Sequence, residues 1–580
     1  MSEKLLLQSV LTTEQNLLKE VEVLKKKNKQ LVFRKRYGLV WDNKIEKFDK
    51  DSKDALPILR EKGDKYPDII TDKNKDFNIL IEGDNYHSLS VLSYTHKNKI
   101  DVIYIDPPYN TGNKDFIYND HYVDREDRFR HSKWLSFMSK RLKLAKTLLK
   151  NDGVIFISID DNELAQLILL CDEIFGEENF VGNITIQGSA NESNEGVMFQ
   201  NVTEYLFCYA KNKLVAKINK IDAVNEYWRS LNDAPSGLST RRQMGYTIYY
   251  NVKTEDMIPK IDYDTNSDFS NLDSIYKDDK ELLRKGYVAI RPKARNGVAW
   301  RWRWGMETLL ERKSELRFRQ SRNRDWVVEF GQSGFNAPRN YQEFGTGTAE
   351  LKKIFDGKEV FTKPKSTELI KWILEVGSSK SATVLDFFAG SGTTGHAVLE
   401  LNDNGGNRKF ILCTNNGDEK SEHKIATDVC YPRMQRVMQG YKNTKGQKIE
   451  GLGSNLKYLK TDFIKLEKSI DYLKHKIVDG STEILCLKEG SFNLVSDSYK
   501  KNRIKVFQSP NRYTAILFDL FYFEDFIEQL KKLKDKPVSV YVFSYTKDFS
   551  KEEFGDLGIK FTIEAIPEKI LETYKTIFNF

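Results

Sequence analysis

The chain has 580 residues, too many for one hydrophobic core, so two to four domains are expected. Its 92 basic and 84 acidic residues give a net charge of +8, which permits nucleic-acid binding without indicating it. No stretch is apolar for the length of a membrane span, and no apolar signal-peptide core follows Met1. The five cysteines form no C-x-x-C pair, which argues against a zinc site or disulfides and fits a reducing cytoplasm.

The first part of the chain predicts a helical arm followed by alternating helices and strands. Residues 1–30 are polar and lysine-rich, with leucine and valine at helical spacing. In residues 31–212, the strands expected at 77–81, 101–105 and 154–159 are short and apolar, as in a parallel sheet covered on both faces.

The most informative stretch, Asp106-Pro107-Pro108-Tyr109, directly follows the strand expected at 101–105. Proline fixes φ near about −65° and has no N–H, so the strand ends in a stiff tip with free carbonyl groups. Asp106 and the carbonyls can accept hydrogen bonds from an amino group on a flat ring while Tyr109 stacks on that ring, which suits a flipped nucleobase. On its geometry alone, a rigid turn is favoured by about two to one.

Residues 213–345 have few long apolar runs and many aromatic and basic residues. Trp and Arg alternate from Trp300 to Trp304, which predicts a strand with its rings on one face and Arg301 and Arg303 on the other. This pattern alone slightly favours an amphipathic strand with solvated arginines. Guanidinium groups, however, are also the usual readers of phosphates and guanine edges.

A glycine-rich turn, residues 389–395, follows a buried strand expected at 383–388 and precedes a helix. Its letters match G-x-G-x-x-G, so a dinucleotide site is one interpretation. His396 stands where a P-loop needs lysine, which argues against nucleotide triphosphate hydrolysis. The next strand, 409–414, ends in Asn415-Asn416, where a dinucleotide site would carry an acid.

Together these two motifs resemble those of the amino-methyltransferases of DNA, and the order of tetrad before glycine-rich turn is typical of the permuted β class. The segments at 78–85, 134–142, 152–176 and 361–366 also resemble this family. The similarity covers roughly residues 30 to 460, and the run from Lys35 to Trp41 is most like the modification subunits of type III restriction systems.

The resemblance implies a Rossmann-like, doubly wound, mostly parallel α/β sheet in permuted order, with an inserted target recognition domain and a small C-terminal domain. The expected domains are an N-terminal helical arm (1–30), a catalytic half (31–212), the target recognition domain (213–345), an S-adenosylmethionine-binding half (346–454) and an association domain (455–580).

The resemblance also assigns roles to individual residues. The tetrad Asp106, Pro107, Pro108 and Tyr109 is expected to be catalytic. The residues expected to bind S-adenosylmethionine are Asp84, Lys365, Asp386, Phe388, Ala389, Gly390, Gly392, Thr393 and Asn415, with Asp84 and Lys365 the weaker candidates. The asparagine pair leaves the ribose ligand open. The residues expected to contact DNA are Arg291, Lys293, Arg295, Arg301 and Arg303.

The implied reaction is methyl transfer to N6 of a flipped adenine in double-stranded DNA, without a metal. N4 of cytosine is a chemically similar alternative, and Asp rather than Ser at the first tetrad position favours adenine by resemblance. An RNA methyltransferase is a further alternative but would explain the large insert less well, and a nicotinamide-dinucleotide-binding protein would leave the tetrad unexplained. A homodimer is expected. Without helicase signatures in this chain, restriction activity would belong to a separate chain, whose existence stays open.

Overall fold

The computed structural model describes residue 21 and residues 40–578, except 62, 64, 114, 120, 188–201, 221–226, 270–274, 322–323, 333–336, 418–422, 466–469, 500–502 and 545–548. The helical arm expected at 1–30 lies outside the described residues apart from Val21. The described residues form two compact units, one from residues 1–219 with 339–580 and one from residues 220–338.

A ten-stranded sheet forms the centre of the first unit, in the order β1-β20-β2-β17-β16-β3-β6-β8-β7-β15. Neighbouring strands from β20 to β6 are parallel, and β1 and β8 pair antiparallel with β20 and β6. This is the expected mostly parallel sheet. Its strands are β1 (Ala55–Glu61), β2 (Phe77–Glu82), β3 (Ile100–Ile105), β6 (Leu149–Ile159), β7 (Phe180–Gln187), β8 (Thr203–Ala210), β15 (Tyr341–Glu343), β16 (Thr383–Asp386), β17 (Lys409–Thr414) and β20 (Asn455–Lys465).

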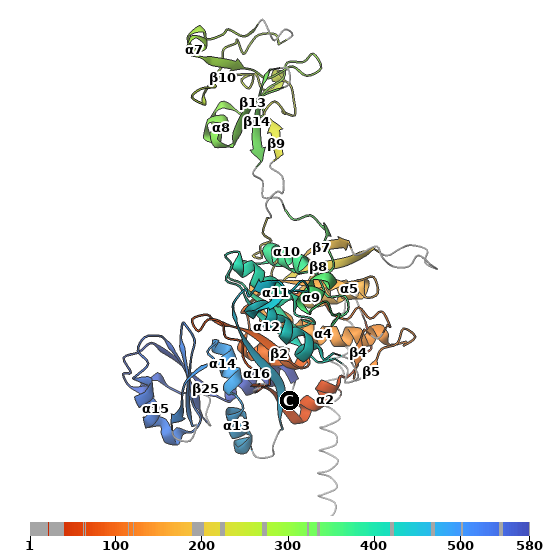
Figure 1. Ribbon diagram of the computed structural model, residues 1–580, viewed down its shortest axis with the longest axis vertical. Coiled ribbons are helices and arrows are strands. Elements are labelled where there is room, and N and C mark those ends of the chain that lie inside the picture. The colour runs from red at the N-terminus through yellow and green to blue at the C-terminus, as the bar shows by residue number, and fades with distance from the viewer. Residues whose placement is uncertain are drawn as a thin grey trace, which may run out of the picture. The chain divides into compact units, whose positions relative to one another are not determined.

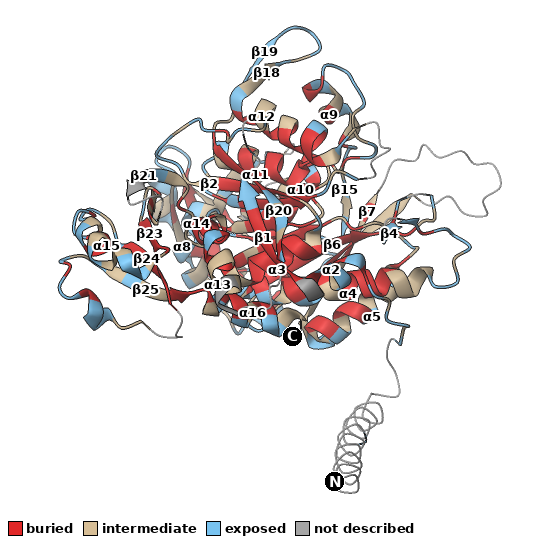
Figure 2. Cartoon of the chain, turned by 90° about the horizontal axis from the view of Figure 1, so that it is seen from below, coloured by how far each residue is buried: buried red, intermediate tan, exposed pale blue. Residues whose placement is uncertain are grey.

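Two helical layers cover the sheet, as expected for a doubly wound fold (Figure 2). One layer contains α2 (Lys47–Asp54), α3 (Asn85–Thr95), α4 (Arg130–Leu148) and α5 (Leu164–Phe175). The other contains α9 (Thr348–Ile354), α10 (Thr367–Gly377), α11 (Thr393–Asp403) and α12 (Tyr431–Gln439). Asp84 caps α3 and Ser366 caps α10, each by accepting from N–H groups of the first turn.

The register of β3 against β16 positions the two sequence motifs. Val102 pairs with Val384 and Ile103 with Leu385, although more than 250 residues separate the strands. All four side chains are fully buried, and each such burial stabilises the fold by about 1.5–3 kcal/mol. Because the strands are parallel, the tetrad after β3 and the glycine-rich turn after β16 meet at one edge of the sheet.

The C-terminal region was expected to begin at residue 455, and this boundary is wrong. Residues 455–465 form β20, which fills the position between β1 and β2 in the main sheet. A five-stranded sheet of order β21-β22-β23-β24-β25 follows (Figure 1). The Tyr574 hydroxyl also donates to the Pro57 carbonyl at 2.6 Å, so the last helix is joined to the first strand.

The elements of this region are α13 (Ile470–Asp479), α14 (Thr482–Glu489), β21 (Asn493–Tyr499), β22 (Ile504–Gln508), β23 (Tyr513–Leu517), α15 (Phe523–Leu530), β24 (Val538–Phe543), β25 (Phe561–Ile566) and α16 (Glu568–Phe578). Short hairpins elsewhere in the first unit are β4 (Ile117–Tyr118) with β5 (His121–Tyr122) and β18 (Gly440–Lys442) with β19 (Lys448–Glu450). No described helix has the length and apolar character that crossing a membrane requires.

The second unit contains two three-stranded antiparallel sheets around its own core. Its elements are β9 (Tyr227–Ser230), β10 (Thr247–Asn251), β11 (Asp256–Lys260), α7 (Lys280–Arg284), β12 (Tyr287–Ile290), α8 (Met306–Glu311), β13 (Leu316–Gln320) and β14 (Trp326–Gln332). The strand expected at 300–304 does not form. Trp302 and Trp304 enter the core while the chain bends before α8, so strict alternation of the two faces is lost.

Candidate active site

The tetrad at the end of β3 is held from two sides. The indole Nε1 of Trp134 donates to the Pro108 carbonyl at 2.7 Å. On the other side, Asn110 has a φ of 60° and donates to the Glu163 carboxylate at 2.5 Å. Glu163 is fully buried and also contacts His131 at 2.7 Å. These contacts fix the tip beyond the stiffness of its prolines.

Asp106 engages one carboxylate oxygen and leaves the other open. The Tyr109 hydroxyl donates to Oδ1 at 3.0 Å, and the Lys365 ammonium lies 3.5 Å from the same atom. Among the described residues, no donor contacts Oδ2 or the Pro107 carbonyl. Burial raises the pKa of Asp106, and the positive charge of Lys365 opposes this rise. The tetrad therefore presents two open acceptors, one of them on a carboxylate whose pKa burial raises.

Glu204 on β8 completes this cluster, and the sequence analysis missed it. Its Oε2 lies 3.1 Å from the Tyr109 hydroxyl, whose single proton it shares with Asp106, and forms an ion pair with Lys365. Burial opposes ionisation of Glu204, but the Lys365 charge lowers its pKa. Lys365 was expected near the cofactor, yet its ammonium contacts the tetrad. No local signal marks Glu204, because only the pairing of β8 with β6 brings it to this edge.

Asp386 anchors the glycine-rich turn at the end of β16. Its Oδ1 accepts from the Phe388 N–H at 3.0 Å, and its Oδ2 accepts from the Thr394 hydroxyl at 2.5 Å. Gly390 has a φ of +49°, and a Cβ there would lie 3.2 Å from the Phe361 ring. The turn therefore needs glycine for both its conformation and its close packing.

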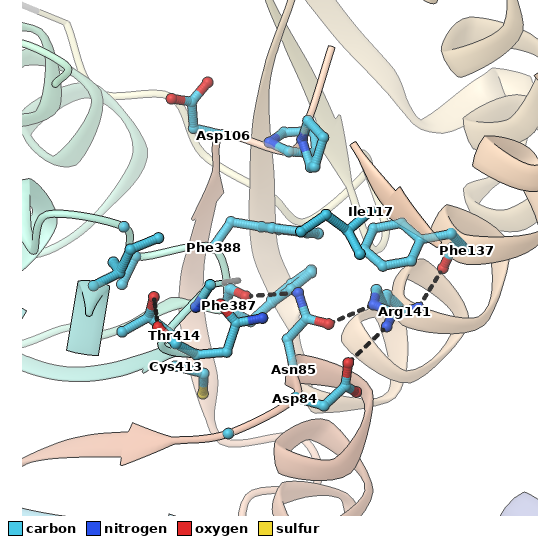
Figure 3. A pocket seen from close by; sticks show the side chains of 18 of the residues that line it. Asp84, Asn85, Asp106, Ile117, Phe137, Arg141, Phe387, Phe388, Cys413 and Thr414 are labelled. Atoms are coloured by element: carbon cyan, nitrogen blue, oxygen red, sulfur yellow. Dashed lines mark hydrogen bonds and ion pairs between the residues drawn. The ribbon is translucent and has the colours of Figure 1, made fainter. Parts of the chain in front are cut away.

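A cavity of about 730 Å³ joins the two motifs (Figure 3). Of the expected site residues, its wall contains Asp84, Asp106, Pro107, Pro108, Lys365, Asp386, Phe388, Ala389, Gly390, Thr393 and Asn415. Tyr109 and Gly392 are not part of this wall. Gly392 has a φ of +79°, and its missing side chain would meet the Cys430 sulfur at 3.0 Å. This glycine permits the left-handed conformation before α11 rather than leaving room for a ligand.

A buried arginine supports the floor of the cavity. Arg141 donates from Nε to Asn85 at 2.5 Å and lies 3.3 Å from the Asp84 carboxylate, and Asn85 donates to the Phe387 carbonyl at 3.0 Å (Figure 3). Asp84 also accepts from the Tyr86 N–H at 2.8 Å, capping α3. Asp84 therefore has a structural role, because its carboxylate already pairs with Arg141 and caps α3. Asn85 joins α3 to the glycine-rich turn.

A second buried arginine lies behind the turn. Arg433 on α12 donates to the Thr393 hydroxyl at 2.8 Å and to the Ser391 hydroxyl at 3.2 Å. Those bonds come from Nη1, and its Nη2 lies 3.0 Å from the Glu350 carboxylate and 3.2 Å from His396 Nδ1. The Arg433 side chain has no exposed surface. The turn is thus held by side chains from α3 on one side and α12 on the other.

The residues expected to contact DNA lie in the second unit, and each has a partner there. Arg291 forms ion pairs with Asp262 and Asp278, Lys293 with Asp325 and Arg295 with Asp233. Arg303 is exposed and donates to the Asp233 carbonyl at 2.9 Å. Arg301 is only 5% exposed, so the expected exposed guanidinium is wrong for this residue. It turns inward because the predicted strand does not form.

Asp386 gives the site a pH-dependent contribution to stability. Burial raises the pKa of Asp386 to about 7, despite hydrogen bonds from Thr394 and Phe388 that oppose the rise. An unfolded aspartate titrates near about 3.9, so between about pH 4 and 7 the folded chain holds a proton that the unfolded chain releases. Stability from this group should therefore fall as the pH rises through that window.

Chemical denaturation of wild type and Asp386→Asn between about pH 5 and 8 checks this sign. Wild type should lose a few kcal/mol relative to the variant as the pH rises, at about 1.4 kcal/mol per pKa unit. A stability difference that stays constant with pH would show that Asp386 is ionised throughout.

Residues 100–475 match a protein family described as DNA methylase. The EcoPI Mod subunit of a type III restriction-modification enzyme, from Escherichia phage P1, is 30% identical over 69% of this chain and 68% of its own length. The type II methyltransferase M.KpnI of Klebsiella pneumoniae is 34% identical over 63% of this chain and 89% of its own.

The chain is also similar to a third relative and to a solved structure. The StyLTI Mod subunit of a type III restriction-modification enzyme, from Salmonella typhimurium, is 33% identical over 60% of this chain and 54% of its own length. Among solved structures, the cytosine-N4-specific PvuII DNA methyltransferase matches with a TM-score of 0.32 at 10% identity, over 63% of this chain and 90% of its own. Because the family match covers more than half of this chain, the chain belongs to the DNA methylase family and is a DNA methyltransferase.

Proposed function

We propose that this chain transfers a methyl group from S-adenosylmethionine to N6 of an adenine flipped out of double-stranded DNA, as the modification subunit of a type III restriction-modification system. The observation that carries the proposal is the pairing of β3 with β16, which brings tetrad and glycine-rich turn to one cavity. The type III Mod subunits among the relatives support the assignment of the system.

The cavity wall fits S-adenosylmethionine by its donor and acceptor groups. Asp84 and Asp386 supply carboxylates for an amino group, and the N–H groups before α11 suit a carboxylate. Asn415, on the same wall, offers an amide to the ribose hydroxyls. When bound, the cofactor supplies an electrophilic methyl group on a sulfonium. The family resemblance implies that Asp386 and the backbone of Phe388 to Gly392 hold its methionine end, and Phe388 to Ser391 lie in the cavity wall.

The tetrad would activate the adenine amine, which is a poor nucleophile because its lone pair is delocalised into the ring. Asp106 Oδ2 and the Pro107 carbonyl are open and can each accept one N–H of the amine. This localises the lone pair and fixes its direction, and such alignment supplies most of the rate in a desolvated site. Tyr109 would stack on the base, a contact worth roughly 1–3 kcal/mol.

The cluster around Asp106 also offers a path for the released proton. Methylation of the amine requires that one N–H bond break, and the raised pKa of Asp106 favours transfer of this proton to its carboxylate. The Tyr109 hydroxyl bridges Asp106 to Glu204, whose side chain is 39% exposed. Glu204 can therefore pass the proton to solvent.

The cysteines and the type III assignment support a cellular location and two partners for the chain. All five cysteines are free and buried in the structure, which supports a reducing cytoplasm. Double-stranded DNA is the proposed partner, and a restriction subunit on a separate chain follows from the type III assignment. Association as a homodimer stays a prediction.

Nucleoside analysis tests the proposal. Unmethylated bacterial DNA is incubated with the protein and S-adenosylmethionine, digested to nucleosides and examined by mass spectrometry. N6-methyladenine should accumulate with time. Formation of N4-methylcytosine instead would favour the cytosine alternative, and the absence of any methylated base would contradict a DNA methyltransferase.

A further inference from the structure

Arg301 is a buried cation without a carboxylate partner among the residues that the structure describes. Its guanidinium donates to Ser236 Oγ at 3.1 and 3.3 Å and to the Trp302 carbonyl at 3.2 Å. A weaker contact reaches the Met244 sulfur at 3.6 Å. All these acceptors are neutral. A buried charge is costly unless a charge of opposite sign compensates for it.

Other arginines of the second unit contrast with Arg301, because carboxylates of the same unit neutralise them. The arginines with such ion pairs are Arg229 and Arg295 with Asp233, Arg291 with Asp262 and Asp278, Arg312 with Glu315, and Arg317 and Arg319 with Glu329. The missing carboxylate at Arg301 is therefore a local feature rather than a shortage of acids in the unit.

Two exposed arginines surround Arg301. Arg241 lies between Ser236 and Met244, both of which Arg301 contacts, and the Met244 N–H donates to the Arg241 carbonyl at 3.0 Å. Arg303 follows Arg301 by two residues. Burial lowers the pKa of Arg301, and the positive charges of Arg241 and Arg303 lower it further.

The Arg241 backbone bonds to Leu238 and Met244, but its guanidinium has no hydrogen bond or ion pair within the described part of the chain. The Asp233 carboxylate lies near enough to feel the charge of Arg303, but it already forms ion pairs with Arg229 and Arg295. Positive charge is therefore in excess around Arg301, which favours the binding of an anion.

Backbone hydrogen bonds hold this group in place. The Leu238 N–H donates to the Ala299 carbonyl and the Trp302 N–H to the Met244 carbonyl, each at 2.8 Å. The segment that carries Ser236 and Arg241 is thus attached on both sides of Arg301. The fold therefore keeps the guanidinium groups together despite their repulsion. Such an arrangement is expected where a bound anion neutralises the positive charges.

We propose that Arg241, Arg301 and Arg303 form a phosphate-binding cluster that holds a backbone phosphodiester of double-stranded DNA. Arg241 and Arg303 contact the phosphate, and Arg301 adds charge from behind and positions Ser236. This inference rests on the proposed function, because it assigns DNA as the source of the phosphate. It differs from the sequence-based expectation by including Arg241 and by removing Arg301 from direct contact.

The binding of a fluorescent DNA duplex of fixed sequence tests the cluster, measured from about 50 to 200 mM salt. Arg241→Ala should weaken binding by about tenfold and reduce the slope of log K against log salt by about one. Arg241→Lys should keep most of the slope, because it keeps the charge. The matched control is Arg284→Ala, an exposed arginine of the same unit that also lacks a partner among the described residues.

A second measurement uses inorganic phosphate alone as the probe. Replacing chloride by phosphate at constant ionic strength should raise the melting temperature of wild type more than that of Arg241→Ala, because a ligand stabilises the state that binds it. Equal rises would overturn the cluster, as would an affinity and salt slope of Arg241→Ala equal to those of wild type or of Arg284→Ala.

Methylation by the same wild-type preparation separates the two proposals. If wild type methylates DNA and Arg241→Ala binds it normally, the phosphate cluster is wrong while the proposed function stands. If wild type forms no methylated base, the proposed function fails, whatever the phosphate measurement shows.

Discussion

Replacing Asp106 by alanine should reduce kcat for methyl transfer by roughly 10²–10⁴-fold, the range expected for loss of a positioned proton acceptor. The variant loses the open Oδ2 that is proposed to accept from the amine, and with it the carboxylate proposed to take up the released proton. Binding of S-adenosylmethionine should change little, because Asp386, Asn415 and the glycine-rich turn remain. Single-turnover methylation and calorimetric titration with the cofactor measure the two quantities separately.

The matched control is Asp152→Ala. Asp152 is an exposed carboxylate on β6, toward the opposite end of the strand from the tetrad. This variant should keep both the rate and the cofactor affinity of wild type. A near-normal rate in Asp106→Ala would remove the tetrad from the mechanism. A loss of cofactor binding equal to the loss of rate would instead assign Asp106 to the cofactor.

The parts of this site that could be predicted are those whose chemistry is local. Two consecutive prolines after an apolar strand restrict their own backbone, and glycines between a strand and a helix define a turn. Parallel strands then place both motifs at one edge, so the cavity wall contains most of the expected residues. The expected strands at 101–105 and 409–414 coincide with β3 and β17 within one residue.

The residues that were missed act through contacts that only tertiary structure creates. Glu204 reaches Lys365 across 161 positions, and Arg433 reaches Thr393 from a helix 40 positions later. Neither belongs to a motif, so neither residue type nor spacing marks it. Arg301 is the opposite case, a residue that was predicted to be exposed and is buried. Its alternation with tryptophan places it on an exposed face only in a strand, and that strand does not form.

Replacing Arg433 by methionine should destabilise the protein by about 3–5 kcal/mol, the usual cost of removing one partner from a buried ion pair. Burial opposes ionisation of Glu350, but the His396 hydrogen bond and the Arg433 charge hold its pKa at about 2. Without Arg433, that carboxylate keeps only part of its compensation. The Ser391 and Thr393 hydroxyls also lose their donor, so the glycine-rich turn should loosen.

Arg436→Met is the control, because Arg436 lies one turn further along α12 and its side chain is 34% exposed. Its ion pair with Asp356, at 3.0 Å, is also exposed, so the expected loss is at most about 1 kcal/mol. Arg433→Lys keeps the charge but not the forked geometry and should recover part of the stability and of the cofactor affinity. Denaturant unfolding and cofactor titration together measure these effects. If Arg433→Met and Arg436→Met unfold alike and bind the cofactor like wild type, the glycine-rich turn keeps its conformation without α12.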